Sequence, residues 1–315
     1  MSHADRPRTP DADDPLVAAL LARCVFPAAG TEVTCAVSGG ADSSALLALA
    51  VAAGLRVTAV HVDHGLRGGS EHEADRVRRM ASAWGAAFRS ERVAVAHGAD
   101  LEARARDARR AVLPGACLFG HTADDQAETV VVRLLRGTGP TGLAAMRADT
   151  HPLLALRRAD TESLCEHLGV EPVVDPTNDD DRFVRNRVRH QVLPLLDDVA
   201  GRDVVPLLCR LADLAAQDAS LVEALAALVD PTDASALAEA PRPVAVAAWR
   251  RWWSDCTGQP HPPDRAATER VLAVAGGAAR ACDVAEGWRL ARTGGRLRLE
   301  RHGPGIAAPS HGGTS

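Results

Sequence analysis

The chain contains no lysine, and all 36 of its lysine-or-arginine positions are arginine. This absence excludes a Walker A phosphate loop, because that loop requires a lysine directly after its second glycine. The seven cysteines are scattered and form no C-x-x-C pair, which argues against both a zinc knuckle and a disulfide framework. We expect them to be small buried thiols.

Long apolar runs are also absent. No stretch of 18 uninterrupted apolar residues occurs, so no membrane span is expected. Residues 1–14 are polar and acidic, without the basic and apolar regions of a secretory signal, and we therefore predict a cytoplasmic protein. A net charge of −5 argues against a protein that coats nucleic acid over its whole surface.

The length of 315 residues suits two domains. Over residues 15–200, predicted strands alternate with predicted helices, which indicates an α/β fold with a parallel, Rossmann-like sheet. The predicted strands are 33–37, 56–62, 86–95 and 116–119. The predicted helices are 16–24, 45–53, 71–84, 101–112, 124–135, 159–168 and one that a turn at 175–180 opens and that runs to 192. A glycine-rich segment, 136–143, is predicted to be an irregular loop.

Residues 201–302 are predicted to form a smaller, mainly helical domain. Its predicted helices are 204–216, 220–228, 243–253 and 266–275, followed by a hairpin of 288–291 with 296–300. Residues 1–14 and 303–315 have the composition of disordered tails.

The first predicted strand is followed by a turn of small residues, here called the phosphate turn: Ser38, Gly39, Gly40, Ala41, Asp42 and Ser43. Adjacent glycines permit positive φ and let a ligand approach the backbone. The free amides and dipole of the following helix favour an anion. We interpret the anion as the polyphosphate of ATP, with Asp42 as a ligand of the accompanying Mg²⁺. The alternative is an ordinary strand–turn–helix connection with a side-chain cap.

A group of acids opens the helix predicted at 124–135. Asp124 and Glu128 are four residues apart, and Asp125 and Glu128 are three apart, so these carboxylates share a helix face. Like charges placed together need a cation, and Mg²⁺ bound to ATP would supply one. One carboxylate could also act as general base for an attacking amine. The alternative is simple capping, because acids suit a helix N-terminus.

His61 and His64 lie at the end of the second predicted strand, with Arg67 beside them. A zinc site would need further ligands, and His121 is the one candidate. We therefore favour hydrogen-bond donation to phosphate or substrate.

Arginines gather in three clusters that suit bidentate phosphate contacts. The clusters are Arg76, Arg78 and Arg79; Arg104, Arg106, Arg109 and Arg110; and Arg182, Arg185, Arg187 and Arg189. In the third, spacings of three and four predict one basic helix stripe. Asn178 and Asn186 add amides that can recognise polar partners. These faces would fit RNA docking at a defined place, and solvated helix faces are the alternative.

Several motifs together resemble the tRNA(Ile)-lysidine synthetase family of the N-type ATP pyrophosphatase, or PP-loop, superfamily. They are Ser38-Gly-Gly-Ala-Asp-Ser43, His61-Val-Asp-His-Gly-Leu-Arg67, Leu101-Glu-Ala-Arg-Ala-Arg106, Gly120-His-Thr-Ala-Asp-Asp-Gln-Ala-Glu-Thr129, Arg136-Gly-Thr-Gly139, Pro152-Leu-Leu154 and Arg185-Asn-Arg-Val-Arg189. The resemblance covers about residues 31–196. Thr177, Arg110 and His151 depart from the family pattern, in which serine, an aromatic residue and arginine are usual.

The resemblance implies a two-step ligation at the wobble cytidine of a CAU-anticodon isoleucine tRNA. ATP adenylates the oxygen on carbon 2 of the cytosine and releases pyrophosphate, and an amine of free lysine then displaces AMP. The product, lysidine, pairs with A instead of G and changes the tRNA from methionine to isoleucine identity.

The resemblance also implies residue roles. The phosphate turn, His61 and His64 would bind ATP, and Asp42 with Asp124 or Asp125 would hold Mg²⁺. Asp125 and Glu128 would bind and deprotonate the lysine ammonium, while Arg106 and Arg189 would stabilise developing phosphate charge. Residues expected to contact tRNA are Arg67, Arg109, Arg136, Asn178, Arg185 and Asn186. The helical domain would bind tRNA as well. The oligomeric state stays open, and a homodimer is one option.

Three other functions compete with this interpretation. A tRNA thiolase of the same superfamily also adenylates a base, but it needs a cysteine pair or an iron–sulfur cluster, and no C-x-x-C is present. A glutamine-dependent amidotransferase would need an N-terminal cysteine nucleophile, which is missing. A non-catalytic RNA partner would not need the acids and the phosphate turn, which are intact.

Overall fold

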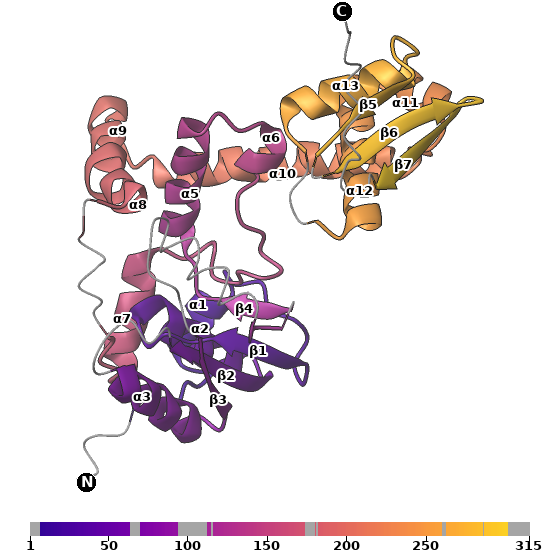
Figure 1. Cartoon of the computed structure of the whole chain (residues 1–315). Coiled ribbons are helices and arrows are strands. Elements are labelled where there is room, and N and C mark those ends of the chain that lie inside the picture. The colour runs from indigo at the N-terminus through magenta and orange to yellow at the C-terminus, as the bar shows by residue number, and fades with distance from the viewer. Residues whose placement is uncertain are drawn as a thin grey trace, which may run out of the picture. The chain divides into compact units, whose positions relative to one another are not determined.

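The computed structural model describes residues 7–63, 70–93, 112–114, 116–173, 180, 182–259, 263–285 and 287–301 (Figure 1). The chain divides into two compact units, Met1–Ala216 and Gln217–Ser315. The division falls inside helix α10 (Val205–Ala226), whereas the sequence places a domain boundary between residues 200 and 201.

The first unit is built on a parallel sheet, as the alternation of elements predicts. Its strands are β1 (Glu32–Ala36), β2 (Arg56–Asp63), β3 (Ala87–Arg92) and β4 (Cys117–Phe119). Their order is β3-β2-β1-β4, and all three pairings are parallel. The chain order therefore reverses between β1 and β4, and ligands of such sheets bind at the carboxyl ends of the strands next to this reversal.

The helices of the first unit lie before, between and after the strands in the sequence. They are α1 (Pro15–Leu21), α2 (Ala41–Ala52), α3 (Ser70–Ala83), α5 (Ala123–Leu135), α6 (Pro140–Leu143), α7 (Arg158–Leu168), α8 (Val184–Arg187), a π-helical turn η3 (Val188–Val192) and α9 (Leu193–Ala200). Residues 44–50 of α2 are all buried, so this helix lies inside the main core, packed on β1, β2 and α7. A helix that is apolar all round is typical of such a position.

A second, smaller core fixes α5 against the helices that follow residue 183. Ala127 and Val131 of α5 pack with Val188 and Leu193, and with 204–205. The polar face of α5 is thereby turned toward residues that lie about 60 positions later in the chain. This packing brings the predicted site acids next to the third arginine cluster.

Several elements differ from the sequence-based expectations. The glycine-rich loop contains the short helix α6, and the helices expected at 204–216 and 220–228 are one continuous helix, α10. The helix expected to end at 192 continues to 200 through η3. Pro194 explains the widened turn, because it cannot donate a hydrogen bond to the carbonyl of residue 190. The backbone N–H of Arg8 donates to the Leu168 carbonyl (2.8 Å), although residues 1–14 are expected to be a disordered tail.

The second unit contains the C-terminal end of α10, α11 (Ala234–Glu239), α12 (Arg242–Thr257) and α13 (Arg265–Ala275). A three-stranded antiparallel sheet follows: β5 (Ala281–Asp283), β6 (Trp288–Thr293) and β7 (Arg296–Arg301). The predicted hairpin is confirmed as β6 and β7, and β5 extends it. The buried rings of Trp249 and Trp253 lie at the centre of this unit's core. Among the described helices, none is long and apolar enough to cross a membrane.

Candidate active site

The phosphate turn is held together by one hydroxyl group. Ser43 Oγ accepts hydrogen bonds from the backbone N–H groups of Ser38 (3.2 Å) and Gly39 (3.1 Å), and it donates to the carbonyl of Gly40 (3.0 Å). Gly39 has φ +93°, a conformation that glycine adopts without strain. The N-cap residue, Gly40, has no side chain to satisfy the first amides of α2. These amides therefore point out of the turn toward the carboxyl edge of the sheet, where an anion can accept from them.

Two backbone segments contact this turn, one on each side. A Cβ atom on Gly120 would lie 2.4 Å from the carbonyl oxygen of Asp42, so the end of β4 can approach α2 only as glycine. On the other side, the N–H of Val173 donates to the Gly39 carbonyl (2.9 Å). The turn is therefore locked between β4 and the segment that follows α7.

Asp42 lies in the first turn of α2 with 24% of its side chain exposed. Thr161 Oγ1 donates to Asp42 Oδ1, and the nearest cation to Oδ2 is Arg158 Nε at 3.8 Å. Burial raises the pKa of Asp42 to about 6, and the neighbouring charge of Asp125 adds to this, while the Thr161 hydrogen bond opposes it. Asp42 is thus a mostly buried carboxylate whose ionised form a further cation would stabilise.

Asp125 and Glu128 of α5 form, with Asp42, the acidic half of what we call the charge cluster. Its basic half is Arg158, Arg185 and Arg189. Glu128 is fully buried, and its Oε2 accepts from Arg185 Nε (2.7 Å) while Oε1 accepts from Arg189 Nε (2.6 Å). Arg158 Nη2 lies 3.5 Å from Glu128 Oε1.

Asp125 uses its two oxygens differently. Oδ2 accepts from the backbone N–H (2.9 Å) and hydroxyl of Thr122, which closes a capping box, and Oδ1 faces Arg185 Nη2 (3.1 Å) and Arg158 Nη2 (3.4 Å). Burial opposes ionisation of Asp125, but the charges of Arg185, His121 and Arg158 hold its pKa below the usual value. The capping alternative is therefore correct for one oxygen, and the other belongs to the charge cluster.

Asp124 points elsewhere. Its carboxylate accepts from Arg157 Nη2 (2.9 Å) and Nε, and from the N–H of Arg158 (2.8 Å). Burial raises its pKa, but these hydrogen bonds bring the net pKa below the usual value. Asp124 and Asp125 diverge because adjacent helix positions point about 100° apart. The structure thus brings Asp42 and Asp125 together and separates Asp124 from both.

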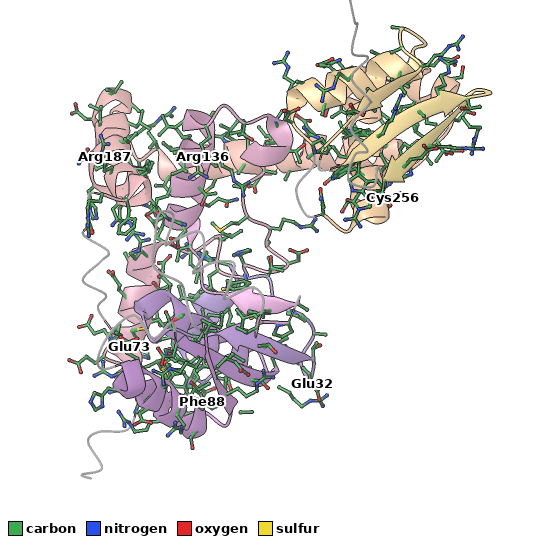
Figure 2. The ribbon with its side chains drawn as sticks, in the orientation of Figure 1. Glu32, Glu73, Phe88, Arg136, Arg187 and Cys256 are labelled. Atoms are coloured by element: carbon green, nitrogen blue, oxygen red, sulfur yellow. The ribbon has the colours of Figure 1, made fainter. Side chains whose placement is uncertain are left out.

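The other described residues of the predicted site lie in different environments. The buried ring of His61 places Nδ1 3.0 Å from the Val37 carbonyl, at the base of the phosphate turn. Asn186 is buried and donates to the carbonyl of Asp180 (2.9 Å). Arg136 is exposed at the C-terminal end of α5, as Figure 2 shows.

The predicted basic stripe is divided between two environments. Arg182 is exposed and paired with Asp180 (2.6 Å), whereas Arg185 and Arg189 turn inward onto Glu128. The arginines of the predicted stripe therefore face two different environments, solvent for Arg182 and the charge cluster for Arg185 and Arg189. The predicted residues His64, Arg67, Arg106, Arg109 and Asn178 lie outside the described part of the chain.

Sequence reasoning missed Arg157, Arg158 and Thr161, which all come from the start of α7. Arg158 contacts all three carboxylates of the charge cluster, and Thr161 holds Asp42. A signal was present, because two consecutive arginines at a helix N-terminus are disfavoured by the helix dipole and therefore indicate acidic partners.

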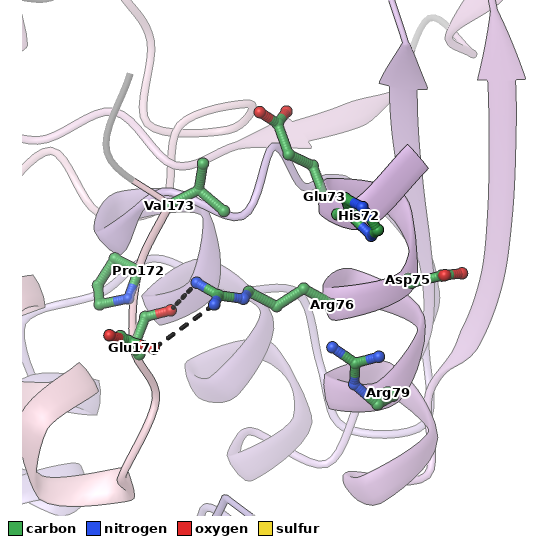
Figure 3. A pocket seen from close by; sticks show the side chains of 8 residues that line it. All are labelled: His72, Glu73, Asp75, Arg76, Arg79, Glu171, Pro172 and Val173. Atoms are coloured by element: carbon green, nitrogen blue, oxygen red, sulfur yellow. Dashed lines mark hydrogen bonds and ion pairs between the residues drawn. The ribbon is translucent and has the colours of Figure 1, made fainter. Parts of the chain in front are cut away.

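A polar hollow of about 350 Å³ lies between α3 and the segment 171–173 (Figure 3). Its lining residues are His72, Glu73, Asp75, Arg76, Arg79, Glu171, Pro172 and Val173. Arg76 crosses it and donates to the Glu171 carbonyl (2.9 Å). No residue of the charge cluster lines this hollow, so it does not contain the predicted chemistry.

The charge cluster offers a carboxylate that suits Mg²⁺. In the described ranges, no three His, Cys, Asp or Glu side chains lie close enough to hold a metal by themselves. Asp42 fits as a single ligand, because the ion pair of its Oδ2 within the described residues is a long one, 3.8 Å to Arg158 Nε, and the charge of Asp125 acts on it. Asp124 does not fit, because both of its oxygens are taken. Any bound Mg²⁺ would need phosphate oxygens to complete its shell.

Comparisons with known proteins agree with the placement of these motifs. The domain family described as "PP-loop domain" matches residues 16–196, and such a domain implies the use of ATP. A protein from Nocardia farcinica named "tRNA(Ile)-lysidine synthase" is 42% identical over 88% of this chain and 94% of its own length. One of the same name from Thermobifida fusca is 40% identical over 71% of this chain and 76% of its own. Among solved structures, a U34-tRNA thiolase from Methanococcus maripaludis gives a TM-score of 0.49 at 17% identity, over 63% of this chain and 76% of that chain.

Proposed function

Because the chain belongs to the tRNA(Ile)-lysidine synthase family of PP-loop ligases, we propose that it joins lysine to the wobble cytidine of a CAU-anticodon isoleucine tRNA. The observation that carries the proposal is the convergence of the phosphate turn with two further carboxylates, Asp125 and Glu128, at the reversal point of the sheet. One site then offers a phosphate cradle beside two carboxylates to which an ammonium would bind.

The first step activates the base. The oxygen on carbon 2 of the cytosine attacks the α-phosphorus of ATP, a new P–O bond forms, and the bond to the β-phosphate breaks to release pyrophosphate. The α2 amides and the hydroxyls of Ser38 and Ser43 would bind the leaving pyrophosphate. Arg189, and Arg106 beyond the described residues, would stabilise the charge that develops on the phosphates.

Mg²⁺ would neutralise phosphate charge in this step, with Asp42 as its protein ligand and Asp125 as the second candidate. Asp42 is suited to this role because it lies at the N-terminal end of α2, directly beside the turn. His61 would act indirectly, since its ring is buried against the Val37 carbonyl and shapes the turn from below.

The second step forms the C–N bond. An amine of lysine attacks carbon 2, the C–O bond to the adenylate breaks, AMP leaves, and the amine loses a proton. Asp125 and Glu128 would attract the incoming ammonium and accept that proton. Arg158, Arg185 and Arg189 already contact these acids, so lysine would displace a guanidinium contact as it enters. We therefore assign Arg185 to positioning Asp125 and Glu128, in place of the tRNA contact expected from the sequence.

The remaining tRNA contacts are proposed for exposed cations. Arg136 at the end of α5 is exposed. Arg67, Arg109 and Asn178, which lie outside the described residues, are proposed as further tRNA contacts. The second unit would supply further tRNA contacts. Free lysine, Mg-ATP and the tRNA complete the set of partners, and a homodimer remains one option for the assembly.

The test is a lysine-incorporation assay. Purified full-length protein is mixed with radiolabelled lysine, Mg-ATP and a CAU-anticodon isoleucine tRNA transcript, and acid-precipitable label is counted. A matched transcript with uridine at the wobble position is the control. We expect label on the cytidine transcript alone, and none with the Asp42→Asn variant.

Other results would point to the competing functions. Pyrophosphate release without bound lysine would retain adenylation and indicate a different nucleophile, as in a thiolase. Neither label nor pyrophosphate from folded protein would contradict the proposal and favour a non-catalytic RNA partner.

A further inference from the structure

Three rings gather at the carboxyl end of β4. The ring centroids of Phe119 and His151 are 5.6 Å apart with planes at 26°, a stacked arrangement, and those of His121 and His151 are 5.0 Å apart. Phe119 and His121 are separated by 6.1 Å. All three side chains are partly exposed.

The rings border the phosphate turn. Phe119 and His121 flank Gly120, the glycine whose Cβ position would lie 2.4 Å from the Asp42 carbonyl oxygen. The charge of His121 also acts on Asp125 in the charge cluster. A flat molecule resting on these rings would therefore lie next to both the ATP phosphates and the acids.

Backbone contacts fix the segment that supplies His151. The N–H of Phe119 donates to the Thr150 carbonyl (2.9 Å), which ties this segment to β4. His151 Nδ1 lies 2.9 Å from Thr150 Oγ1 and 3.0 Å from the Arg147 carbonyl, so the orientation of its ring is determined.

The same segment is also tied to α5. The buried side chain of Gln126 makes two hydrogen bonds to the backbone of Met146 (2.9 and 3.1 Å). Beside it, Ala145 has φ +51°, the one positive φ outside glycine in the described residues. Backbone strain of this kind persists where the surrounding structure holds it, often at functional sites. The rings are thus presented by a rigid frame.

We propose that Phe119, His121 and His151 form a stacking platform for the target pyrimidine of the tRNA once it has left its stack. This inference rests on the proposed function. An enzyme that modifies a base must hold the base outside the stack, and aromatic side chains supply sequence-tolerant stacking for that purpose. The platform would place carbon 2 of the base near the phosphate turn, while specificity would come from polar groups around it.

The test uses a tRNA transcript that carries the fluorescent cytosine analogue pyrrolocytosine at the wobble position. Full-length protein is added without ATP, and stacking on the platform is expected to change the analogue's fluorescence. His151→Ala should abolish most of that change and lower kcat/KM for unmodified tRNA about 10- to 100-fold, the range expected from loss of one base–aromatic contact. The KM for ATP should stay within about threefold of the wild type.

Two further variants separate stacking from folding. His151→Phe keeps a ring without the imidazole nitrogens and should retain kcat/KM within about threefold. His72→Ala, an exposed histidine on α3, is the matched control and should have no effect. Thermal melting of each variant checks that it is folded.

Several outcomes would overturn the platform. They are an unchanged His151→Ala variant, equal losses in His151→Ala and His151→Phe, or a wild-type protein that forms lysidine without any fluorescence change. The rings would then act only as packing, as Phe119 does where it meets Val60, Leu113 and Cys117. Failure of lysine incorporation by the wild type, with the fluorescence change still present, would instead contradict the proposed function and leave the platform supported.

Discussion

The phosphate turn and the charge cluster share Asp42, yet they are built in opposite ways. In the turn, the hydrogen bonds of Ser43 join residues three to five positions apart. In the charge cluster, the arginine partners of Asp125 and Glu128 lie 30 or more positions away. The turn is a local structure that can form wherever its sequence occurs after a strand. The cluster exists only after α5, α7 and α8 have packed together.

The two regions also differ in how closely a buried carboxylate is paired with cations. Glu128 is fully buried but paired with two close guanidinium groups, whereas Asp42 is less buried and lies 3.8 Å from the Arg158 guanidinium. Removing the charge of Glu128 should therefore destabilise the folded protein, and removing the charge of Asp42 should stabilise it. The following predictions use this difference.

Glu128→Gln should have the largest effect. It removes the fully buried carboxylate that Arg185 and Arg189 both contact most closely, and loss of one member of such a buried ion pair costs about 3–5 kcal/mol of unfolding free energy. Lysine incorporation should fall by a factor on the order of 100 or more. Urea denaturation followed by circular dichroism measures the first effect. Glu223→Gln, at an exposed position of α10, should stay within about 0.5 kcal/mol of the wild type. A similar small change for Glu128→Gln would show that the cluster is not a buried ion network.

Asp42→Asn should lose activity on the order of 10²- to 10³-fold but gain stability at pH 8. The pKa of Asp42 is raised to about 6 in the folded protein, so the folded state holds this proton more tightly than the unfolded state. Wild-type stability therefore falls as pH rises from about 4 to about 6, and asparagine avoids this loss.

The expected gain for Asp42→Asn is about 3 kcal/mol above pH 7 and disappears below about pH 4. Denaturation at pH 4.5 and pH 8, in a chelator and without ATP, measures it. A variant that is less stable than the wild type at pH 8 would show that Asp42 is a satisfied charge like Glu128.

Ser43→Ala should have a moderate, local effect. The N–H groups of Ser38 and Gly39 lose their acceptor, which costs about 1–2 kcal/mol, and the KM for ATP should rise about tenfold. Ser82→Ala, at an exposed position of α3, is the control and should leave both quantities unchanged. An unaltered KM for ATP in Ser43→Ala would mean that backbone packing alone shapes the turn.

Asp124→Asn should have the smallest effect. Its carboxylate serves Arg157 and the Arg158 amide, so we expect about 1 kcal/mol of destabilisation, activity within a few fold, and no change in the Mg²⁺ concentration for half-maximal rate. A large rise in that Mg²⁺ requirement would return Asp124 to the metal site.

These differences explain which parts of the molecule could be predicted from the sequence. The parallel sheet follows from alternating elements, and the phosphate turn follows from six consecutive residues. The inward turn of Arg185 could not be read from its spacing, because a helix stripe at spacings of three and four looks the same whether it faces RNA or Glu128. The continuity of α10 was missed because Asp218 and Ser220 interrupt the apolar pattern, although Gln217 and Ala219 are good helix formers.

The sequence by itself determined the local chemistry of this protein: the glycines and serines of the turn, the acids of α5, and the arginine in every cationic position outside histidine. The tertiary structure alone decided which charges meet. Asp124 and Asp125 are neighbours in the chain, yet they face different arginines, because the direction of a helical side chain is local and its partner is set by long-range packing. The position of Arg158 on three carboxylates and of the rings beside Gly120 has the same origin.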